Sequence, residues 1–148
     1  MIAALSLVGF YAWWGAWVPS KRLVISASII AVLGLACDLF AESLFIGWLP
    51  ARIETLARLG SLASGGAANA LYTIAGIFLT LGTPSLRGLL RICAWAIWLS
   101  GIALTVSTVA GNVAGITIST ALLVSLLCPW VAIFGRRLTR DYRKTAAT

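Results

Sequence analysis

The sequence contains no histidine and carries very little charge. Of its 148 residues, 61% are hydrophobic and only 10% are charged, with 11 Lys and Arg against 4 Asp and Glu. The missing imidazole excludes histidine-based zinc or copper sites, histidine-ligated haem and histidine general bases. Soluble domains carry about 25% charged residues, and a chain this short cannot bury so much apolar surface. The sequence therefore predicts an all-α integral membrane protein.

Cysteines are few and widely spaced. Cys37, Cys93 and Cys128 lie inside apolar segments and form no C-x-x-C pair, so we interpret them as small hydrophobic side chains rather than as a disulfide framework. The net charge of +7 does not indicate nucleic acid, because the basic residues lie in short connections and in the tail. We expect no cofactor, no metal site and no nucleic-acid partner.

Five apolar segments are long enough, or nearly long enough, to cross the hydrocarbon core, which takes about 20 helical residues. They are residues 2–18, 23–49, 62–82, 89–110 and 113–134, and a basic tail at 135–148 continues the last helix. Residues 92–134 carry no charge, but as one helix they would be about 65 Å long. The run must fold back, and Gly111-Asn112 is the plausible turn. We therefore expect a single transmembrane domain, a bundle of five helices.

The segment between the second and third spans has a different character. Ile53, Leu56 and Ala57 share one helical face, and Arg52, Glu54 and Arg58 point elsewhere. This pattern predicts a short helix lying on the outer membrane surface.

The distribution of basic residues predicts the orientation of the bundle. With the C-terminus in the cytoplasm and five spans, the N-terminus lies outside. Nine basic residues then lie inside, namely Lys21, Arg22, Arg87, Arg91, Arg136, Arg137, Arg140, Arg143 and Lys144, and two lie outside, Arg52 and Arg58. This asymmetry follows the positive-inside rule and suits the inner (plasma) membrane of a bacterial cell. The positions of the tryptophans agree with this orientation, since tryptophan is enriched at membrane interfaces. Trp48 lies near the outer boundary, and five lie near the inner one: Trp13, Trp14, Trp17, Trp95 and Trp130.

The second span contains two acids, Asp38 and Glu42, one helical turn apart. An acidic side chain at the centre of a spanning helix costs roughly 2.5–3.5 kcal/mol on insertion scales. Intramembrane acids are for this reason candidates for function, and this pair is positioned to share protons. The alternative is that both stay protonated and serve as interhelical hydrogen-bonding groups.

The third span carries polar residues at the same depth. Asn69 and Thr73 are four residues apart, hence on one face, with Tyr72 beside them. Because consecutive antiparallel spans tend to pack together, we expect Glu42 to pair with Asn69 and Asp38 with Thr73. The ligand- or proton-binding site is thus predicted to comprise Asp38, Glu42, Asn69, Tyr72 and Thr73, in a polar cavity that opens outward or sideways. No catalytic residue is assigned.

Three functions fit this sequence. The first is binding or transport of a small ligand, cation or proton through the acidic site, in which case a homo-oligomer is expected. The second is an accessory or structural subunit of a larger membrane complex, suggested by the large lipid-facing surface. The third is a metal-free lipid or isoprenoid isomerase or cyclase, in which a carboxylic acid and a carboxylate exchange protons with a double bond. Enzyme activity is left open by the sequence.

Overall fold

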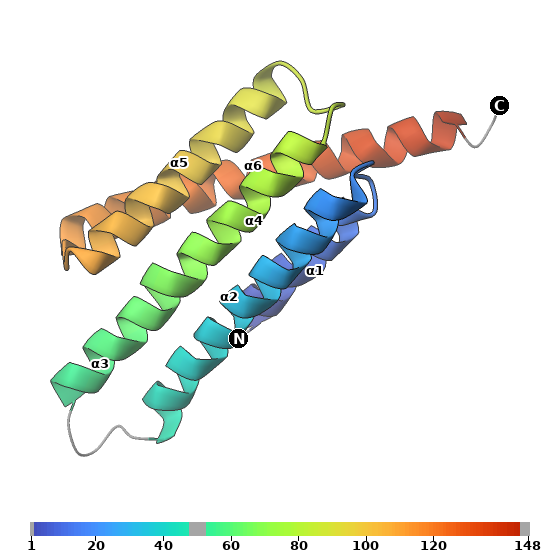
Figure 1. The fold of residues 1–148 in the computed structure, drawn as a ribbon. Helices are drawn as coiled ribbons and strands as arrows, with labels where there is room; N and C mark the ends of the chain where they lie inside the picture. Colours follow the sequence, from blue (N-terminus) through green and yellow to red (C-terminus); the bar gives the residue numbers. More distant parts are fainter. Residues whose placement is uncertain (1, 48–52, 146–148) are drawn as a thin grey trace.

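The structure, a computed structural model, describes residues 2–47 and 53–145. Within those ranges every regular element is a helix: α1 (Ile2–Gly15), α2 (Lys21–Gly47), α3 (Ile53–Ser61), η1 (Leu62–Ala68), α4 (Asn69–Gly82), α5 (Leu89–Val109) and α6 (Val113–Thr145) (Figure 1). Four stretches are long and apolar enough to cross a membrane: Lys21–Ile46, Glu54–Gly82, Leu89–Val109 and Val113–Leu138. The all-helical class and four of the five expected membrane-length helices are thereby confirmed.

The first helix is shorter than expected. It ends at Gly15 rather than at residue 18, because the backbone N–H groups of Trp17 and Val18 bond to the carbonyls of Trp14 and Gly15 in a tight turn. The 14 residues of α1 fall short of the roughly 20 that a span requires. Its side chains nevertheless pack against α2 and α4, so α1 is an integral part of the bundle.

Residues 53–82 form one uninterrupted helical stretch of three parts. The predicted separate helix at the membrane surface is wrong in this respect, because α3 runs directly into η1 and then α4 without a break. The third membrane-length helix thus begins at about Glu54 instead of residue 62. Its middle part, η1, is a π-helix in the small-residue sequence LASGGAA. π-Helical turns inside α-helices are frequently found at functional sites.

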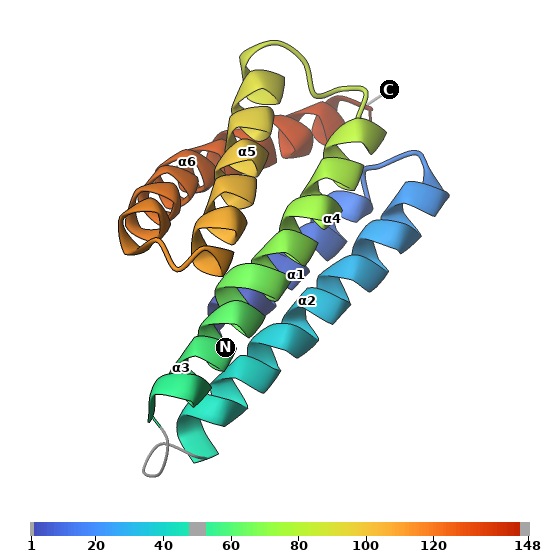
Figure 2. The ribbon, with the colours of Figure 1, turned by 60° about the vertical axis from the view of Figure 1, so that its left-hand side comes forward.

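The turn between α5 and α6 lies where it was expected. Gly111 has φ 67°, and the Asn112 side-chain oxygen accepts a hydrogen bond of 3.0 Å from the Gly115 N–H at the start of α6. α5 lies beside α4 on the side away from α2, as two views show, and α6 packs against α5 and crosses behind α4 in the view of Figure 1 (Figures 1 and 2). α4 is therefore the central helix, with α2 on one side and α5 on the other.

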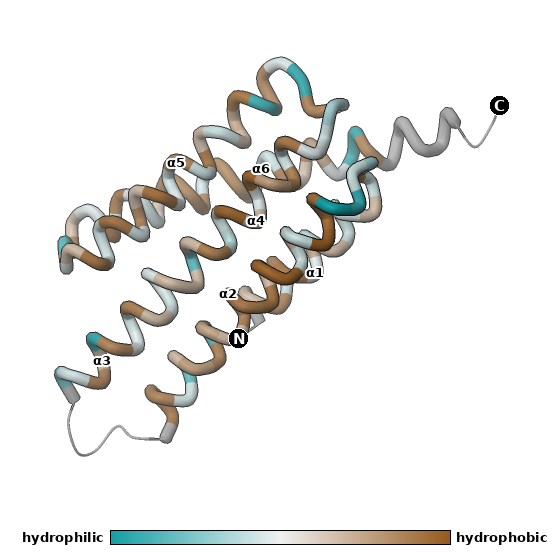
Figure 3. Tube along the Cα trace, viewed as in Figure 1, coloured by the Kyte–Doolittle hydropathy of each residue, from teal (hydrophilic) through white to brown (hydrophobic). Residues whose placement is uncertain are grey.

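One end of the bundle gathers basic residues. There the turn before α2 meets the end of α4, since a Cβ on Gly82 would contact Val18 and Leu23, and the Trp130 indole N–H of α6 donates to the Leu90 carbonyl of α5 at 2.8 Å. We call this end, defined by the side chains of Lys21, Arg22, Arg87, Arg91, Arg136 and Arg137, the basic end. The hydropathy-coloured trace shows hydrophilic segments near helix ends and long apolar stretches between them (Figure 3).

An aromatic core fills the bundle near the basic end. Trp14 is fully buried and lies 5.3 Å from Trp130 and 5.2 Å from Phe134 between ring centroids. Trp130 is also buried, so these two tryptophans are core residues and not the interfacial anchors that we predicted. Trp13, Trp17 and Trp95 are half-buried. The expectations for Trp48 and Arg52 lie outside the described residues.

The three cysteines are free thiols. Cys37 and Cys93 are half-buried, as expected of small hydrophobic side chains in a helical bundle, but Cys128 is exposed on α6. Cys128 shares this exposed face of α6 with Val124, one helical turn earlier.

Candidate functional site

Asp38 lies in the seam between α2 and the helix formed by η1 and α4. It follows Lys21 by 17 residues, about 26 Å along the helix axis, and is therefore remote from the basic end. Its Oδ1 accepts a hydrogen bond from the Ser64 hydroxyl at 2.5 Å, and its Oδ2 accepts one from the Tyr72 hydroxyl at 3.0 Å. Both carboxylate oxygens are thus held by neutral hydroxyl donors.

The π-helical segment explains how Ser64 reaches Asp38. In an ordinary α-helix, the eight steps from Ser64 to Tyr72 would turn the chain by about 100° each, which is about 80° more than two full turns. The two side chains would then point about 80° apart around the helix axis. A residue in a π-helix turns the chain by only about 80°, so the four steps from Ser64 to Ala68 remove that difference. Ser64 and Tyr72 therefore face α2 together. Sequence reasoning missed Ser64 because it assumed an ordinary α-helix, and the only signal was the small-residue run Leu62–Ala68.

Tyr72 is held in place by two neighbouring helices. Its ring lies against Gly34 of α2, where a Cβ would collide with the ring carbons. The Tyr11 hydroxyl of α1 donates a hydrogen bond of 2.8 Å to the Tyr72 carbonyl. The Tyr72 side chain is buried, so its hydroxyl is directed at Asp38 with little freedom to turn away.

Glu42 lies one turn further along α2 than Asp38. It is half-buried and is itself engaged in an interaction. The structure thus places both acids on the same face of α2, as their spacing predicted.

Asn69 and Thr73 face the opposite neighbour, α5. The Asn69 amide nitrogen donates one hydrogen bond of 2.7 Å to the Gly101 carbonyl and another of 2.9 Å to Thr105 Oγ1. Thr73 packs against Gly101, where a Cβ would overlap its hydroxyl. The predicted pairing of Asp38 with Thr73 is therefore wrong, because Asp38 accepts its hydrogen bonds from Ser64 and Tyr72. The Asn69 amide nitrogen, which we had expected to bond to Glu42, donates to α5. At 100° per residue, the Tyr72 side chain points about 60° away from Asn69 and about 100° away from Thr73 around the axis of α4.

A lateral groove of about 210 Å³ lies between α4 and α5. It is lined by Ala70, Thr73, Ile74, Ile77, Ile102, Thr105 and Val106. Ile74 and Val106 are exposed at its rim, so the groove opens sideways. Its walls are mainly aliphatic, whereas we had expected a polar cavity. The polar groups nearby do not make the groove polar, because the Asn69 amide donates its hydrogen bond to the Thr105 hydroxyl.

The Tyr72 hydroxyl is expected to contribute to stability through Asp38. We expect Tyr72→Phe to lower the free energy of unfolding by about 1 kcal/mol, between the values for hydrogen bonds to charged groups and those measured within membranes. Unfolding by SDS in mixed micelles, followed by far-UV circular dichroism, measures the change. A double-mutant cycle with Asp38→Ala isolates the pair, and zero coupling energy would contradict the assigned bond.

The site can therefore be described as two polar seams on either side of α4. The α2 seam holds a carboxylate fixed by Ser64 and Tyr72, with Glu42 one turn away, and the α5 seam holds Asn69, Thr73 and Thr105. Among the described residues no group of three or more Cys, Asp and Glu side chains is arranged to hold a metal ion. No protein-family model, characterised protein or solved structure matches this chain.

Proposed function

We propose that this is a small polytopic membrane protein that binds or transports a small cation or a proton at Asp38 and Glu42. The observation that supports the proposal is the Asp38 carboxylate, both oxygens of which accept hydrogen bonds from hydroxyl groups. Neither hydroxyl group brings a positive charge to the carboxylate. An ionised group in a low-dielectric seam is costly unless a positive charge compensates it.

Among the described residues, the helices that meet at Asp38 carry no Lys or Arg beside it. The sequence from residue 23 to 51 contains no Lys or Arg, and neither does the sequence from 59 to 86. A proton or a bound cation is the remaining means of neutralisation.

Access is proposed from the end opposite the basic end. In this arrangement the basic end is cytoplasmic, α1 is a fifth segment that enters the membrane with its N-terminus directed toward the outside, and the membrane is a bacterial-type plasma membrane. Asp38 precedes Gly47, the end of α2, by nine residues, about 14 Å. The route through the basic end is longer, is filled by the aromatic core and repels cations.

A permanent cation tests the proposal, because it has no proton of its own to release. Detergent-solubilised protein in weak buffer is titrated with benzyltrimethylammonium, and separately with Na⁺ and K⁺, while released protons are followed with a pH-sensitive dye. We expect the wild-type protein to release up to about one proton per bound cation. The double variant Asp38→Asn/Glu42→Gln is expected to release none.

Glu54→Gln provides the matched control, since Glu54 is an exposed acid on α3. This variant should release protons as the wild-type protein does. Release that persists in the Asp38→Asn/Glu42→Gln variant, or a wild-type protein that responds to none of the three cations, would overturn the proposal.

A further inference from the structure

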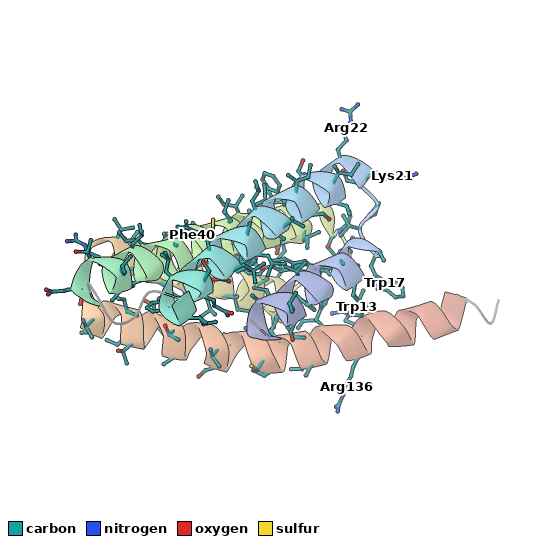
Figure 4. All side chains as sticks on the ribbon, turned by 90° about the horizontal axis from the view of Figure 1, so that it is seen from below. Trp13, Trp17, Lys21, Arg22, Phe40 and Arg136 are labelled. Carbon is teal, nitrogen blue, oxygen red and sulfur yellow. The ribbon has the colours of Figure 1, made fainter. Side chains whose placement is uncertain are left out.

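Six basic side chains are exposed together at the basic end. Lys21 and Arg22 begin α2, Arg87 and Arg91 flank the start of α5, and Arg136 and Arg137 lie near the end of α6. Figure 4 shows Lys21 and Arg22 projecting from one end of α2, with Arg136 projecting from α6 at a similar level. Lys21 and Arg22 project from one side of the bundle and Arg136 from the opposite side, so three segments place positive charge around this end of the molecule.

The described acids lie away from this face. Asp38 and Glu42 are about 26 Å or more along α2 from Lys21, and Glu54 lies on α3 beyond the other end of α2. Asp141 follows in the sequence of α6, among Arg140, Arg143 and Lys144, so the tail adds further net positive charge. The field at the basic end is therefore strongly positive and is largely uncompensated within the chain.

Two helix N-termini also lie at the basic end. α2 and α5 both begin at the basic end, and neither has an acidic residue in its first turn. Gly88 precedes α5 without a side-chain cap. N–H groups at such termini carry about half a positive charge, but the carbonyl ends of α1 and α4 at the same end offset it, so the field comes from the basic side chains.

Tryptophans fix the depth at which this charge lies. Trp13 and Trp17 lie at the basic end (Figure 4) and are half-buried. Half-buried tryptophan at the end of an apolar helix is typical of the layer of lipid headgroups. The positive charge is thus positioned at phosphate level, where the available anions are those of the lipids themselves.

We infer that the basic end is a binding surface for the headgroups of anionic phospholipids such as phosphatidylglycerol. The charges come from three segments on different sides of the bundle, so headgroups all around this end can contact them. Each basic residue near an anionic membrane surface strengthens binding about fivefold. The surface is separate from the Asp38 seam, and the two can be tested independently.

Quenching of tryptophan fluorescence by brominated lipids tests this inference. The purified full-length protein is reconstituted in symmetric phosphatidylcholine vesicles that contain either brominated phosphatidylglycerol or brominated phosphatidylcholine, so that its orientation does not matter. We expect stronger quenching by the anionic lipid, and a weaker preference at high salt. Arg87→Gln/Arg91→Gln is expected to lower the relative binding constant for phosphatidylglycerol at least fivefold.

Two comparisons make the result specific. Lys21→Gln/Arg22→Gln is a second pair at the same end and should also lower the preference, whereas Arg58→Gln, a single exposed arginine on α3, should lower it less than either pair. Equal quenching by the two lipids in the wild-type protein would overturn the inference. So would an equal loss in Arg58→Gln, or abolition of the preference by millimolar inorganic phosphate, which would identify a site for free phosphate.

Discussion

Trp14→Ala is expected to lower the free energy of unfolding by about 3 kcal/mol, the lower end of the range for aromatic truncation in a core. The lower end applies because lipid is as apolar as the protein interior, so that the loss comes from packing and from the cavity. Trp14 is fully buried, and its indole N–H donates a hydrogen bond of 3.0 Å to Thr83 Oγ1. It joins α1 to the end of α4 and to the aromatic side chains of α6.

Two further variants separate the contributions to this loss. Trp14→Phe removes the hydrogen bond but keeps most of the ring, and it should cost about 1 kcal/mol. Trp13→Ala removes a half-buried neighbour and should cost clearly less than Trp14→Ala. The measurement is again SDS unfolding in mixed micelles. A loss below 1 kcal/mol in Trp14→Ala, or an equal loss in Trp13→Ala, would contradict the assigned role of Trp14.

The second large effect is expected from a single added methyl group at Gly76. A Cβ at this position would overlap the six-membered ring of Trp98. Trp98 is only 4% exposed, and its indole N–H donates a hydrogen bond of 2.8 Å to Thr80 Oγ1, so the ring cannot easily move. We expect Gly76→Ala to destabilise the protein by about 2–3 kcal/mol through overpacking between α4 and α5.

Gly9→Ala is the matched control for Gly76→Ala. Nothing lies within 4 Å of a Cβ built at Gly9, so the same chemical change should be neutral or stabilise α1 by up to about 1 kcal/mol. The two substitutions are thus expected to differ in sign when thermal unfolding is compared in the same detergent. A destabilisation shared by both would show that the contact with Trp98 is not its cause.

The sequence was sufficient for those features of the fold that depend on hydrophobic length and on turn chemistry. The uncharged run before Phe134 had to fold back, and Gly111 supplies the positive φ that the turn requires. The end of α1 was not predictable in the same way. The apolar sequence continues to Val18, but the tight turn that closes after Gly15 depends on local hydrogen bonds, which hydropathy does not encode.

The candidate site was predictable only in part. Spacing placed Asp38 and Glu42 on one face of α2 and brought Tyr72 to the same seam. The partners of Asn69 and Thr73 could not be predicted, because the face that α4 turns toward α5 depends on how closely Gly101 and Gly76 let the helices approach. The predicted role of Trp14 as an interfacial anchor was wrong for a related reason. A buried tryptophan and one at the surface of an apolar helix have the same sequence surroundings.

The wide turns of η1 also set how this helix would respond to a change in its length. A chain shortened by one residue between Ser64 and Asn69 can close into ordinary α-helix, and Ser64 and Tyr72 would then still agree in direction to within about 20°. The same deletion between Asn69 and Tyr72 would leave the wide turns intact and rotate Ser64 by about 100° away from Asp38. The helical phase that joins Ser64 to Asp38 thus tolerates a deletion in one short stretch of the chain and not in the next.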